Sequence, residues 1–352
     1  MSTFVVMFVV LMFFRFRQQS KKNKLGKTED KAAFFVVTTM ILFVSAFRHE
    51  YATSDTGDYM NWFIRTGVTD IESLSWLFEK REWGFFLFQK ILYMISPSPL
   101  FFMMASSAVI IIPFCFFVRK YSDDIYISFL FFISYEYFPF FMAGIRQAIA
   151  MVILISSYKY IRDRKLIKFL LCVYAAYTFH NTAIVFAFAY FIVNLKGTIK
   201  QFTVIIVSFL LALIGKDYVT TFLFEILNWD RINSYEKYGG TVTFSGFIIL
   251  FLILLFCSFY RKKVLARDEK NIHFYNLMYV GVACQAFSEV IGEFFRVSMY
   301  FSVFSVILLS KAISVEEHPI YKKIIYILVV IAFGAYLFFR GYARNYLFFW
   351  QY

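Results

Sequence analysis

The sequence predicts an all-α polytopic integral membrane protein with about twelve transmembrane helices, within a range of about ten to thirteen. Two observations predict it. Of the 352 residues, 61% are hydrophobic, including 50 Phe and 25 Tyr, which is more apolar surface than a soluble domain of this size could bury. In addition, 24 of the 36 Lys and Arg residues fall in six short hinges between apolar segments. The other twelve lie on the opposite side with most of the carboxylates, as expected for a membrane protein oriented by the positive-inside rule.

Twelve apolar stretches are expected to cross the hydrocarbon core, which is roughly 30 Å thick. They run approximately over 1–14, 32–47, 100–118, 124–142, 144–160, 166–180, 181–195, 201–215, 243–260, 272–288, 294–313 and 321–339. The first is predicted to be a span rather than a signal peptide, because it lacks a basic leading region and a small-residue cleavage site. The basic hinges at 15–31, 119–124, 159–168, 196–200, 261–270 and 311–323 then all face the cytoplasm, and both termini face outside.

A further apolar run at 85–95 is too short to cross, and Pro97 and Pro99 end it. Counting it as a span would also place the basic hinge at 160–165 outside. We therefore expect an amphipathic helix along the outer interface. Two long outer loops, 48–84 and 216–242, are expected to be functional or lid-like. The spans use most of the chain, so residues 1–352 are predicted to form a single transmembrane domain.

Several function classes are disfavoured. A net charge of +13 would suggest nucleic-acid binding in a soluble protein, but here the excess lies in hinges beside apolar runs. Cys115, Cys172, Cys257 and Cys284 are far apart, with no CxxC pair and no nearby His, so they are predicted to be small core residues. The GxGxxG, GxxxxGK[ST], HExxH and GxSxG motifs are absent. No cofactor and no metal are predicted.

Ionisable groups inside a span are expensive, so each is a functional candidate. Arg146 and Gln147 begin a span directly after Gly144, where no loop holds them in water. Arg146 either contacts a ligand or forms a structural ion pair, for example with Glu136. His180 lies at the junction of two apolar runs, where an imidazole could exchange protons near neutral pH, although a lone His in such a context is often structural.

A second group follows the tenth predicted stretch. Glu289, Glu293 and Arg296 are spaced by four and three residues, so they share one face of a helix. They form either a local salt-bridge ladder or a site at which Arg296 faces an anionic ligand while the glutamates orient it.

The first outer loop carries charged residues next to the membrane surface: Arg48, Asp55 and Asp58, followed by Glu82. A solvated acidic loop would look similar. The Asp55-x-x-Asp58 spacing also resembles a divalent-metal or sugar-nucleotide motif, but it lacks a second carboxylate pair and a cytoplasmic location.

In this order, several short motifs resemble the landmarks of the EpsG-like branch of the Wzy-type polysaccharide polymerases. They are Arg48, the run Asp55-Thr56-Gly57-Asp58 with Trp62, Glu82 with Gly84, the run Ile145-Arg146-Gln147-Ala148 with Ala150, and the run Phe179-His180-Asn181 with Ala183. The resemblance extends over roughly residues 30–340. The family loop often reads closer to Gly-Thr-Asp, which leaves open whether Asp55 or Asp58 is the equivalent acid.

The resemblance implies a fold similar to the integral-membrane (GT-C-like) glycosyltransferases and a reaction at the outer leaflet of the bacterial cytoplasmic (inner) membrane. A growing glycan would move from undecaprenyl diphosphate onto a lipid-linked repeat unit of an O-antigen, capsule or exopolysaccharide. Arg146 and Arg296 would stabilise the diphosphate, because guanidinium donates paired hydrogen bonds and keeps its charge. His180 is the first candidate for the base and Asp58 the second. The remaining predicted substrate-binding residues are Arg48, Asp55, Tyr59, Glu82, Gln147, Asn181, Glu289 and Glu293.

The expected partners are therefore the lipid-linked donor and acceptor and membrane lipid, with a flippase and a chain-length regulator as candidate protein partners and no nucleic acid. A flippase or transporter of lipid-linked oligosaccharide is the alternative from another class. It should carry cations along a path to both leaflets, whereas the non-hinge charges here cluster on one side. An O-antigen ligase-like glycosyltransferase is a closer alternative, which the residues do not separate from a polymerase.

Overall fold

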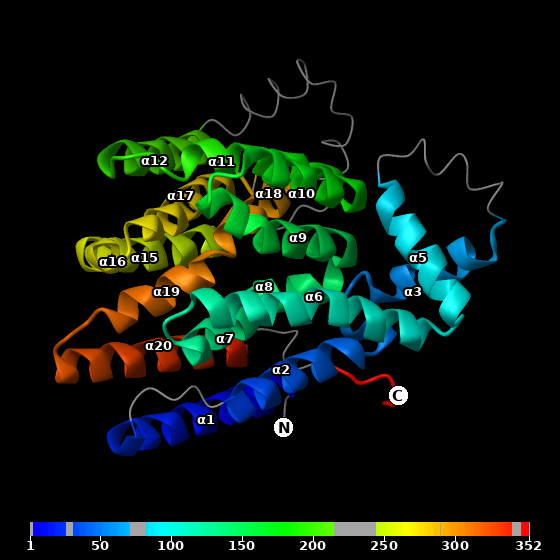
Figure 1. The fold of residues 1–352 in the computed structure, drawn as a ribbon, viewed down its shortest axis with the longest axis horizontal. Coiled ribbons are helices and arrows are strands. Elements are labelled where there is room, and N and C mark those ends of the chain that lie inside the picture. The colour runs from blue at the N-terminus through cyan, green and yellow to red at the C-terminus, as the bar shows by residue number, and fades with distance from the viewer. Residues whose placement is uncertain are drawn as a thin grey trace. The chain divides into compact units, whose positions relative to one another are not determined.

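A computed structural model describes residues 3–25, 31–70, 82–214, 244–288, 290–339 and 346–351. The chain forms two compact units, which are described separately: Met1–Ile184 with Glu317–Tyr352, and Val185–Glu316. Within the described ranges the secondary structure is helical, as predicted, and the β-pairing there is one isolated bridge between Arg48 and Phe348 (Figure 1). The predicted loop 216–242 and Glu289 lie outside these ranges.

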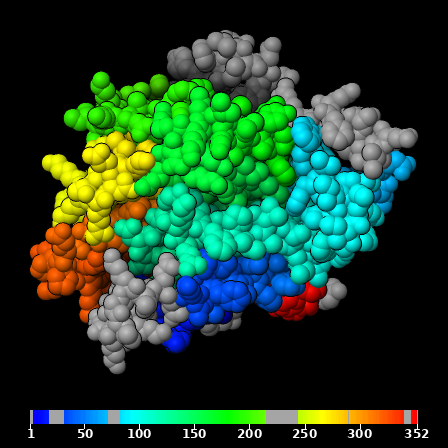
Figure 2. Space-filling model, in the orientation of Figure 1, coloured from blue at the N-terminus to red at the C-terminus, as the bar shows by residue number. Residues whose placement is uncertain are grey.

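In the first unit the order of elements follows the chain. They are α1 (Thr3–Leu25), α2 (Lys31–Ala46), the 3-10 helix η1 (Glu50–Ala52), α3 (Thr56–Val68), α5 (Trp83–Ile95), α6 (Pro99–Tyr121), α7 (Ile125–Ser134), α8 (Tyr137–Ala143), α9 (Ile145–Arg162), α10 (Leu166–Phe179) and α20 (Pro319–Phe339). The 3-10 helix η3 (Asn181–Phe188) continues from α10. Helices α10, α9, α6 and α2 pack side by side in that order (Figures 1 and 2).

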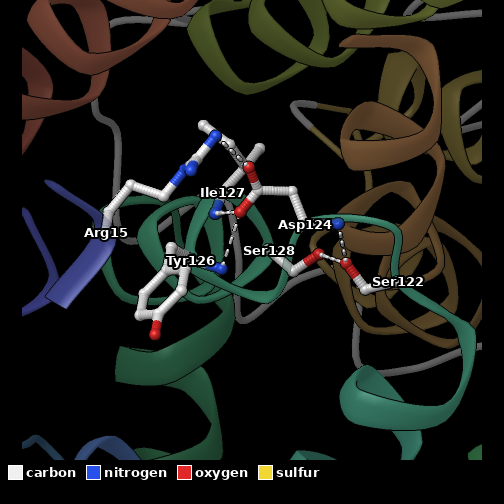
Figure 3. A network of polar contacts seen from close by, with 6 residues as sticks. All are labelled: Arg15, Ser122, Asp124, Tyr126, Ile127 and Ser128. Carbon is white, nitrogen blue, oxygen red and sulfur yellow. Dashed lines mark hydrogen bonds and ion pairs between the residues drawn. The ribbon is translucent and has the colours of Figure 1, made fainter. Parts of the chain in front are cut away.

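In the first unit an ion pair joins the basic hinges at 15–31 and 119–124 (Figure 3). Arg15 Nη2 lies 2.9 Å from Asp124 Oδ2, and both side chains are largely buried. Asp124 also caps α7, because its Oδ1 accepts the backbone N–H groups of Tyr126 at 3.1 Å and Ile127 at 3.4 Å. The Arg15 guanidinium lies over the Tyr326 ring of α20, 5.0 Å from its centroid. The hinges at 15–31 and 119–124 are therefore in contact, and α20 lies beside them.

The second unit contains α11 (Ala189–Ile192), α12 (Ile199–Ile214), α15 (Ser245–Phe259), α16 (Arg261–Arg267), the 3-10 helix η4 (Glu269–Asn271), α17 (Ile272–Ala286), α18 (Glu293–Ser302) and α19 (Ser305–Ser314). Two of its basic hinges also meet. Tyr260 Oη donates to Glu316 Oε2 at 2.8 Å, and Arg267 Nη2 donates to the Ser314 carbonyl at 3.1 Å. In each unit, contacts of this kind join basic hinges that the sequence assigns to one side of the membrane.

Among the described residues, two helices are long and apolar enough to cross a membrane: Pro99–Tyr121 and Pro319–Phe339. The number rises to four if two bent pairs each count as one span, Ile125–Ser134 with Tyr137–Ala143 at 59° and Glu293–Ser302 with Ser305–Ser314 at 41°. Six further apolar helices are shorter. The predicted span 181–195 is a 3-10 helix followed by the four-residue α11. The predicted twelve spans are thus not confirmed, although the helical, apolar character is.

The short apolar run before Pro97 forms α5, close to the predicted 85–95 helix. It contacts α3, α6 and α10. Phe85, Gln89 and Leu92 are buried, whereas Leu87, Ile91, Met94 and Ile95 are exposed. This helix is 13 residues long and stands beside the end of α10, where the predicted site residues lie.

Candidate functional site

Glu82, immediately before α5, binds three of the residues predicted to belong to the site. Its Oε1 lies 2.7 Å from His180 Nδ1 and accepts the backbone N–H of Asn181 at 3.2 Å. Its Oε2 accepts a hydrogen bond from Arg146 Nη1. The side chains of Glu82, His180 and Arg146 are 13%, 14% and 27% exposed. The structure therefore brings together an acid, an imidazole and a guanidinium in a site that is mostly, but not fully, shielded from solvent.

The packing of α9 against α10 explains why these residues meet. Arg146 lies in the first turn of α9, and His180 is the residue that follows α10. The two helices pack together and are joined by the short basic hinge at 163–165, so they run antiparallel. The beginning of α9 and the end of α10 consequently lie together at the end of the hairpin opposite that hinge.

Gly84 brings Glu82 into reach of this pair. A Cβ atom at Gly84 would overlap Thr178 Oγ1 and would lie 2.8 Å from Thr178 Cβ and 3.0 Å from its carbonyl oxygen. Only glycine permits such an approach between the first turn of α5 and the last turn of α10. Gly84 belongs to one of the sequence motifs, but the motif predicts no role for it. The sequence feature that could have indicated this role is the position of Gly84, two residues after Glu82.

The surroundings of Glu82 favour its ionised form. Burial alone would raise the pKa of this carboxyl group, but the hydrogen bond from His180 and the positive charge of Arg146 outweigh it, so the pKa is lowered. Since an ionised carboxylate only accepts hydrogen bonds, the proton that it shares with His180 lies on Nδ1. In the tautomer of the imidazole that carries a single proton there, Nε2 has a lone pair. His180 Nε2 is buried and has no hydrogen-bond partner within the described part of the chain.

A stability measurement tests this assignment of charge. A carboxylate with a lowered pKa stabilises the folded state above the pKa of the unfolded chain, and this contribution is lost as the pH falls through the folded value. We expect wild-type protein to melt above Glu82→Gln at pH 7, with the gap closing as the pH falls below about 4.5. Thermal melting of both proteins in detergent across this range measures it. A gap that persists unchanged at low pH would contradict an ionised Glu82.

The guanidinium of Arg146 makes cation–π contacts with two aromatic rings. Its carbon is 5.1 Å from the centroid of the Trp62 ring and 5.9 Å from that of Tyr59. Tyr59 is 5% exposed and packs edge-on against both Trp62 and Phe85. Arg146 Nε is buried without a hydrogen-bond partner among the described residues. The predicted ion pair of Arg146 is thus formed, but with Glu82. Trp62 belongs to the motifs noted in the sequence and was not assigned to the site.

Arg48 is enclosed by protein and is 1% exposed. Its guanidinium donates to four groups: the carbonyl oxygens of Ser45 and of Met142 (2.8 Å), and the hydroxyl groups of Thr56 (3.2 Å) and Ser107 (3.3 Å). These contacts join the end of α2 to α3, α6 and α8. The predicted contact of Arg48 with sugar or diphosphate stays a prediction, and the contacts observed are internal.

The two candidate acids of the first loop have different surroundings. Asp55 precedes α3, and its Oδ1 accepts a hydrogen bond from Ser54 Oγ at 2.6 Å. Asp58 is exposed in the first turn of α3. Across the described ranges no group of three or more His, Cys, Asp or Glu side chains is placed to hold a metal ion. Gln147 is buried at 1% exposure. Their predicted roles stay predictions.

Glu293 and Arg296 belong to the second unit. Both lie in the first turn of α18 and are partly exposed. Their spacing places them on one face, as predicted. A shared ligand for Arg146 and Arg296 stays a prediction, since the two residues belong to different units.

With this geometry in place, comparison with known proteins adds one positive finding. The sequence profile described as the EpsG family matches residues 31–352. The chain belongs to the EpsG family. As a member of the EpsG family it is a membrane protein of the polysaccharide-polymerase type, and the family is glycosyltransferase-like. Neither a curated protein nor a solved structure gives a significant match to the chain.

Proposed function

We propose that this EpsG family member is a Wzy-type polymerase, which transfers a glycan from undecaprenyl diphosphate onto a lipid-linked repeat unit at the outer leaflet of the cytoplasmic membrane. The observation that carries the proposal is the bridging carboxylate of Glu82, which binds Nδ1 of His180 on one oxygen and Arg146 on the other. These contacts hold an imidazole beside a guanidinium, which supports the proposal because transfer from a diphosphate is helped by a base and a fixed positive charge.

His180 is the proposed base. Its Nε2 takes the proton of the acceptor hydroxyl while that oxygen forms a bond to the anomeric carbon of the donor glycan. The bond between this carbon and the diphosphate oxygen breaks, and undecaprenyl diphosphate leaves with the electron pair. Glu82 holds Nδ1–H and stabilises the imidazolium that forms, the role that a carboxylate plays behind a histidine base in other enzymes.

Arg146 is proposed to stabilise the charge that develops on the leaving diphosphate. The ring faces of Trp62 and Tyr59 keep its guanidinium in place, and its Nε has no hydrogen-bond partner in the described ranges. Neutralisation by guanidinium is the basis for proposing that the reaction needs no divalent metal.

Arg146→Lys is expected to lower activity about ten-fold or more although the charge is kept. An ammonium group cannot reproduce the planar, two-pronged contact with a diphosphate or the stacking on Trp62. The measurement is polymerisation by purified protein with a defined lipid-linked repeat unit. Arg65→Lys, an exposed arginine of α3, is the matched control. Near wild-type polymer from well-folded Arg146→Lys would reduce Arg146 to a structural partner of Glu82.

The same assay tests the whole proposal when it is run with and without a chelator. Polymer formed by the purified protein alone, and unaffected by chelation, is the expected result. No polymer from well-folded protein with its substrate would favour a flippase. Loss of activity on chelation would instead make Asp55 and Asp58 candidates for a metal site.

The outer-leaflet assignment rests on the separation of the Glu82 site from the basic hinges along the α9–α10 hairpin. In a cysteine-free background, Arg65→Cys should react with a membrane-impermeant thiol reagent in intact cells, whereas Lys165→Cys should react only after lysis. Both native side chains are exposed. Labelling of Lys165→Cys from outside would reverse the topology and move the site to the cytoplasmic face.

Two other functions are separable by one observation in cells. In a strain lacking this chain, single lipid-linked repeat units exposed outside indicate a polymerase, and an absence of exposed units indicates a flippase. Polymer that forms but is not joined to its final acceptor indicates a ligase-like enzyme.

A further inference from the structure

Two basic hinges of the second unit, 196–200 and 261–270, line a cavity of about 720 Å³. It lies between the segment at 194–197, α16, η4 and the first turn of α17. Four of its lining residues are cationic, and in this cavity they are opposed by the single carboxylate of Glu269. These four are Lys196, Arg261, Lys262 and Lys270. The cavity therefore favours an anion.

The wall of this cavity is held by buried hydrogen bonds. His273, 2% exposed, places Nε2 2.9 Å from Asn194 Oδ1. One turn further along α17, Asn276 Nδ2 donates to the carbonyl oxygens of Val193 at 2.6 Å and Leu195 at 3.1 Å. The segment that carries Lys196 is thus fixed on α17. The positive-inside rule explains why Lys and Arg are frequent in these hinges. It does not explain why four of them line one cavity.

Arg261 is the most enclosed of the four cations. Its Nε is buried and has no hydrogen-bond partner among the described residues, and its guanidinium carbon lies 5.8 Å from the centroid of the Tyr275 ring. Because at least one N–H group of Arg261 is not used within the described protein, the guanidinium can still donate hydrogen bonds to a phosphate group.

An apolar cavity of about 330 Å³ adjoins the basic one. Leu195 and Asn276 line it, whereas their neighbours Asn194 and His273 line the basic cavity, so the two share the 194–197 segment and α17 as a wall. Its other lining residues include Val204 and Val280.

We propose that the second unit binds an anionic phospholipid, with its phosphate headgroup in the basic cavity and an acyl chain in the apolar one. A soluble anion would use only the first cavity and an uncharged lipid only the second, whereas an amphiphile with one phosphate uses both. Basic pockets between transmembrane helices are known to hold anionic headgroups. The inference does not depend on the proposed polymerase activity.

The test is native mass spectrometry of delipidated full-length protein titrated with phosphatidylglycerol, phosphatidylcholine or glycerol phosphate. We expect phosphatidylglycerol to bind best and Arg261→Gln with Lys262→Gln to weaken it about ten-fold or more, since each cation near the membrane surface contributes to anionic-lipid binding. Lys322→Gln with Lys323→Gln removes the same charge from the α20 hinge and should change binding less than about two-fold. Circular dichroism and melting establish that both variants fold.

Each other outcome opposes the proposal in a defined way. Equal binding of phosphatidylglycerol and phosphatidylcholine would mean an apolar surface only. Glycerol phosphate binding as tightly as phosphatidylglycerol would mean a soluble-anion site. Equal losses in the two double variants would mean diffuse interfacial charge. Tighter binding of a polyprenyl phosphate in a parallel titration would assign the cavities to the carrier lipid.

A second variant keeps the acyl-chain half of the proposal falsifiable. Ala283→Trp adds bulk to the apolar cavity without touching the cations. It should weaken phosphatidylglycerol about ten-fold and leave glycerol phosphate unchanged. Unchanged phosphatidylglycerol binding in folded Ala283→Trp would overturn the placement of the chain.

Discussion

His180→Gln is expected to lower polymerisation turnover by roughly 100-fold or more, the usual scale for a lost general base. A glutamine approximates the size and polarity of the imidazole and can still donate a hydrogen bond to Glu82. It has no nitrogen that can accept a proton. Because Glu82 and Arg146 remain in place, folding and lipid-diphosphate binding should be preserved. The measurement compares single-turnover rates with binding of the lipid-linked donor.

His318→Gln provides the matched control, because His318 is an exposed histidine beside the beginning of α20. It should retain wild-type turnover. If His180→Gln also retains turnover, the base is Asp58 or Glu82, and Glu82→Gln and Asp58→Asn measured in the same assay separate the two. Loss of donor binding together with turnover would instead make His180 a binding residue.

The sequence predicts the composition of this site better than its connections. The cost of ionisable groups in apolar segments is sufficient to single out Arg146 and His180, and the loop acids add Glu82. The pairing was not predictable, because it depends on the contact of α5 with α10, and that contact depends on Gly84 facing Thr178. The ion-pair partner considered for Arg146 was Glu136. In the structure Glu136 accepts a hydrogen bond from Tyr336 Oη at 3.3 Å, and Arg146 binds Glu82.

Arg48 shows a different limit. A charged residue at the end of an apolar run looks the same in the sequence whether it faces a ligand or the protein interior. Its acceptors include two backbone carbonyl oxygens, one of them at Met142, and backbone acceptors leave no residue-specific signal. Only the three-dimensional arrangement of α2, α6 and α8 shows that the Arg48 guanidinium donates its hydrogen bonds to groups inside the protein.

Hydropathy locates apolar helices but does not define which of them cross. The run 124–142 is apolar on average, yet it breaks between α7 and α8 with a bend of 59°. The run 181–195 is also apolar on average and is mostly a 3-10 helix. Mean hydropathy does not detect such breaks because it averages a few polar residues, such as Ser134 and Glu136, into a long apolar window. By contrast, Pro97 and Pro99 end α5 close to the predicted residue, because proline imposes a local restriction on the backbone.

Gly84→Ala is expected to lower turnover to about the level of Glu82→Gln, roughly 100-fold, although Ala is chemically inert and lies two residues from the carboxylate. The new Cβ would overlap Thr178 Oγ1 and come within 2.8 Å of Thr178 Cβ, so α5 must move away from α10. Glu82 moves with α5, whereas His180 stays with α10, and the 2.7 Å contact between them is lost. His180 Nδ1–H then has no fixed acceptor, and the lone pair on Nε2 is no longer enforced.

Gly57→Ala is the matched control. A Cβ atom at Gly57 in α3 lies 3.9 Å from its nearest neighbours, so this variant should keep its activity and its melting temperature. Thr178→Gly combined with Gly84→Ala removes the overlapping atoms and leaves the Thr178 carbonyl oxygen, at 3.0 Å, as the nearest contact. It should recover part of the turnover. Wild-type turnover in Gly84→Ala alone would show that the approach of α5 to α10 does not position Glu82. Equal losses in Gly84→Ala and in the double variant would point to a general defect in folding rather than to the separation of Glu82 from His180.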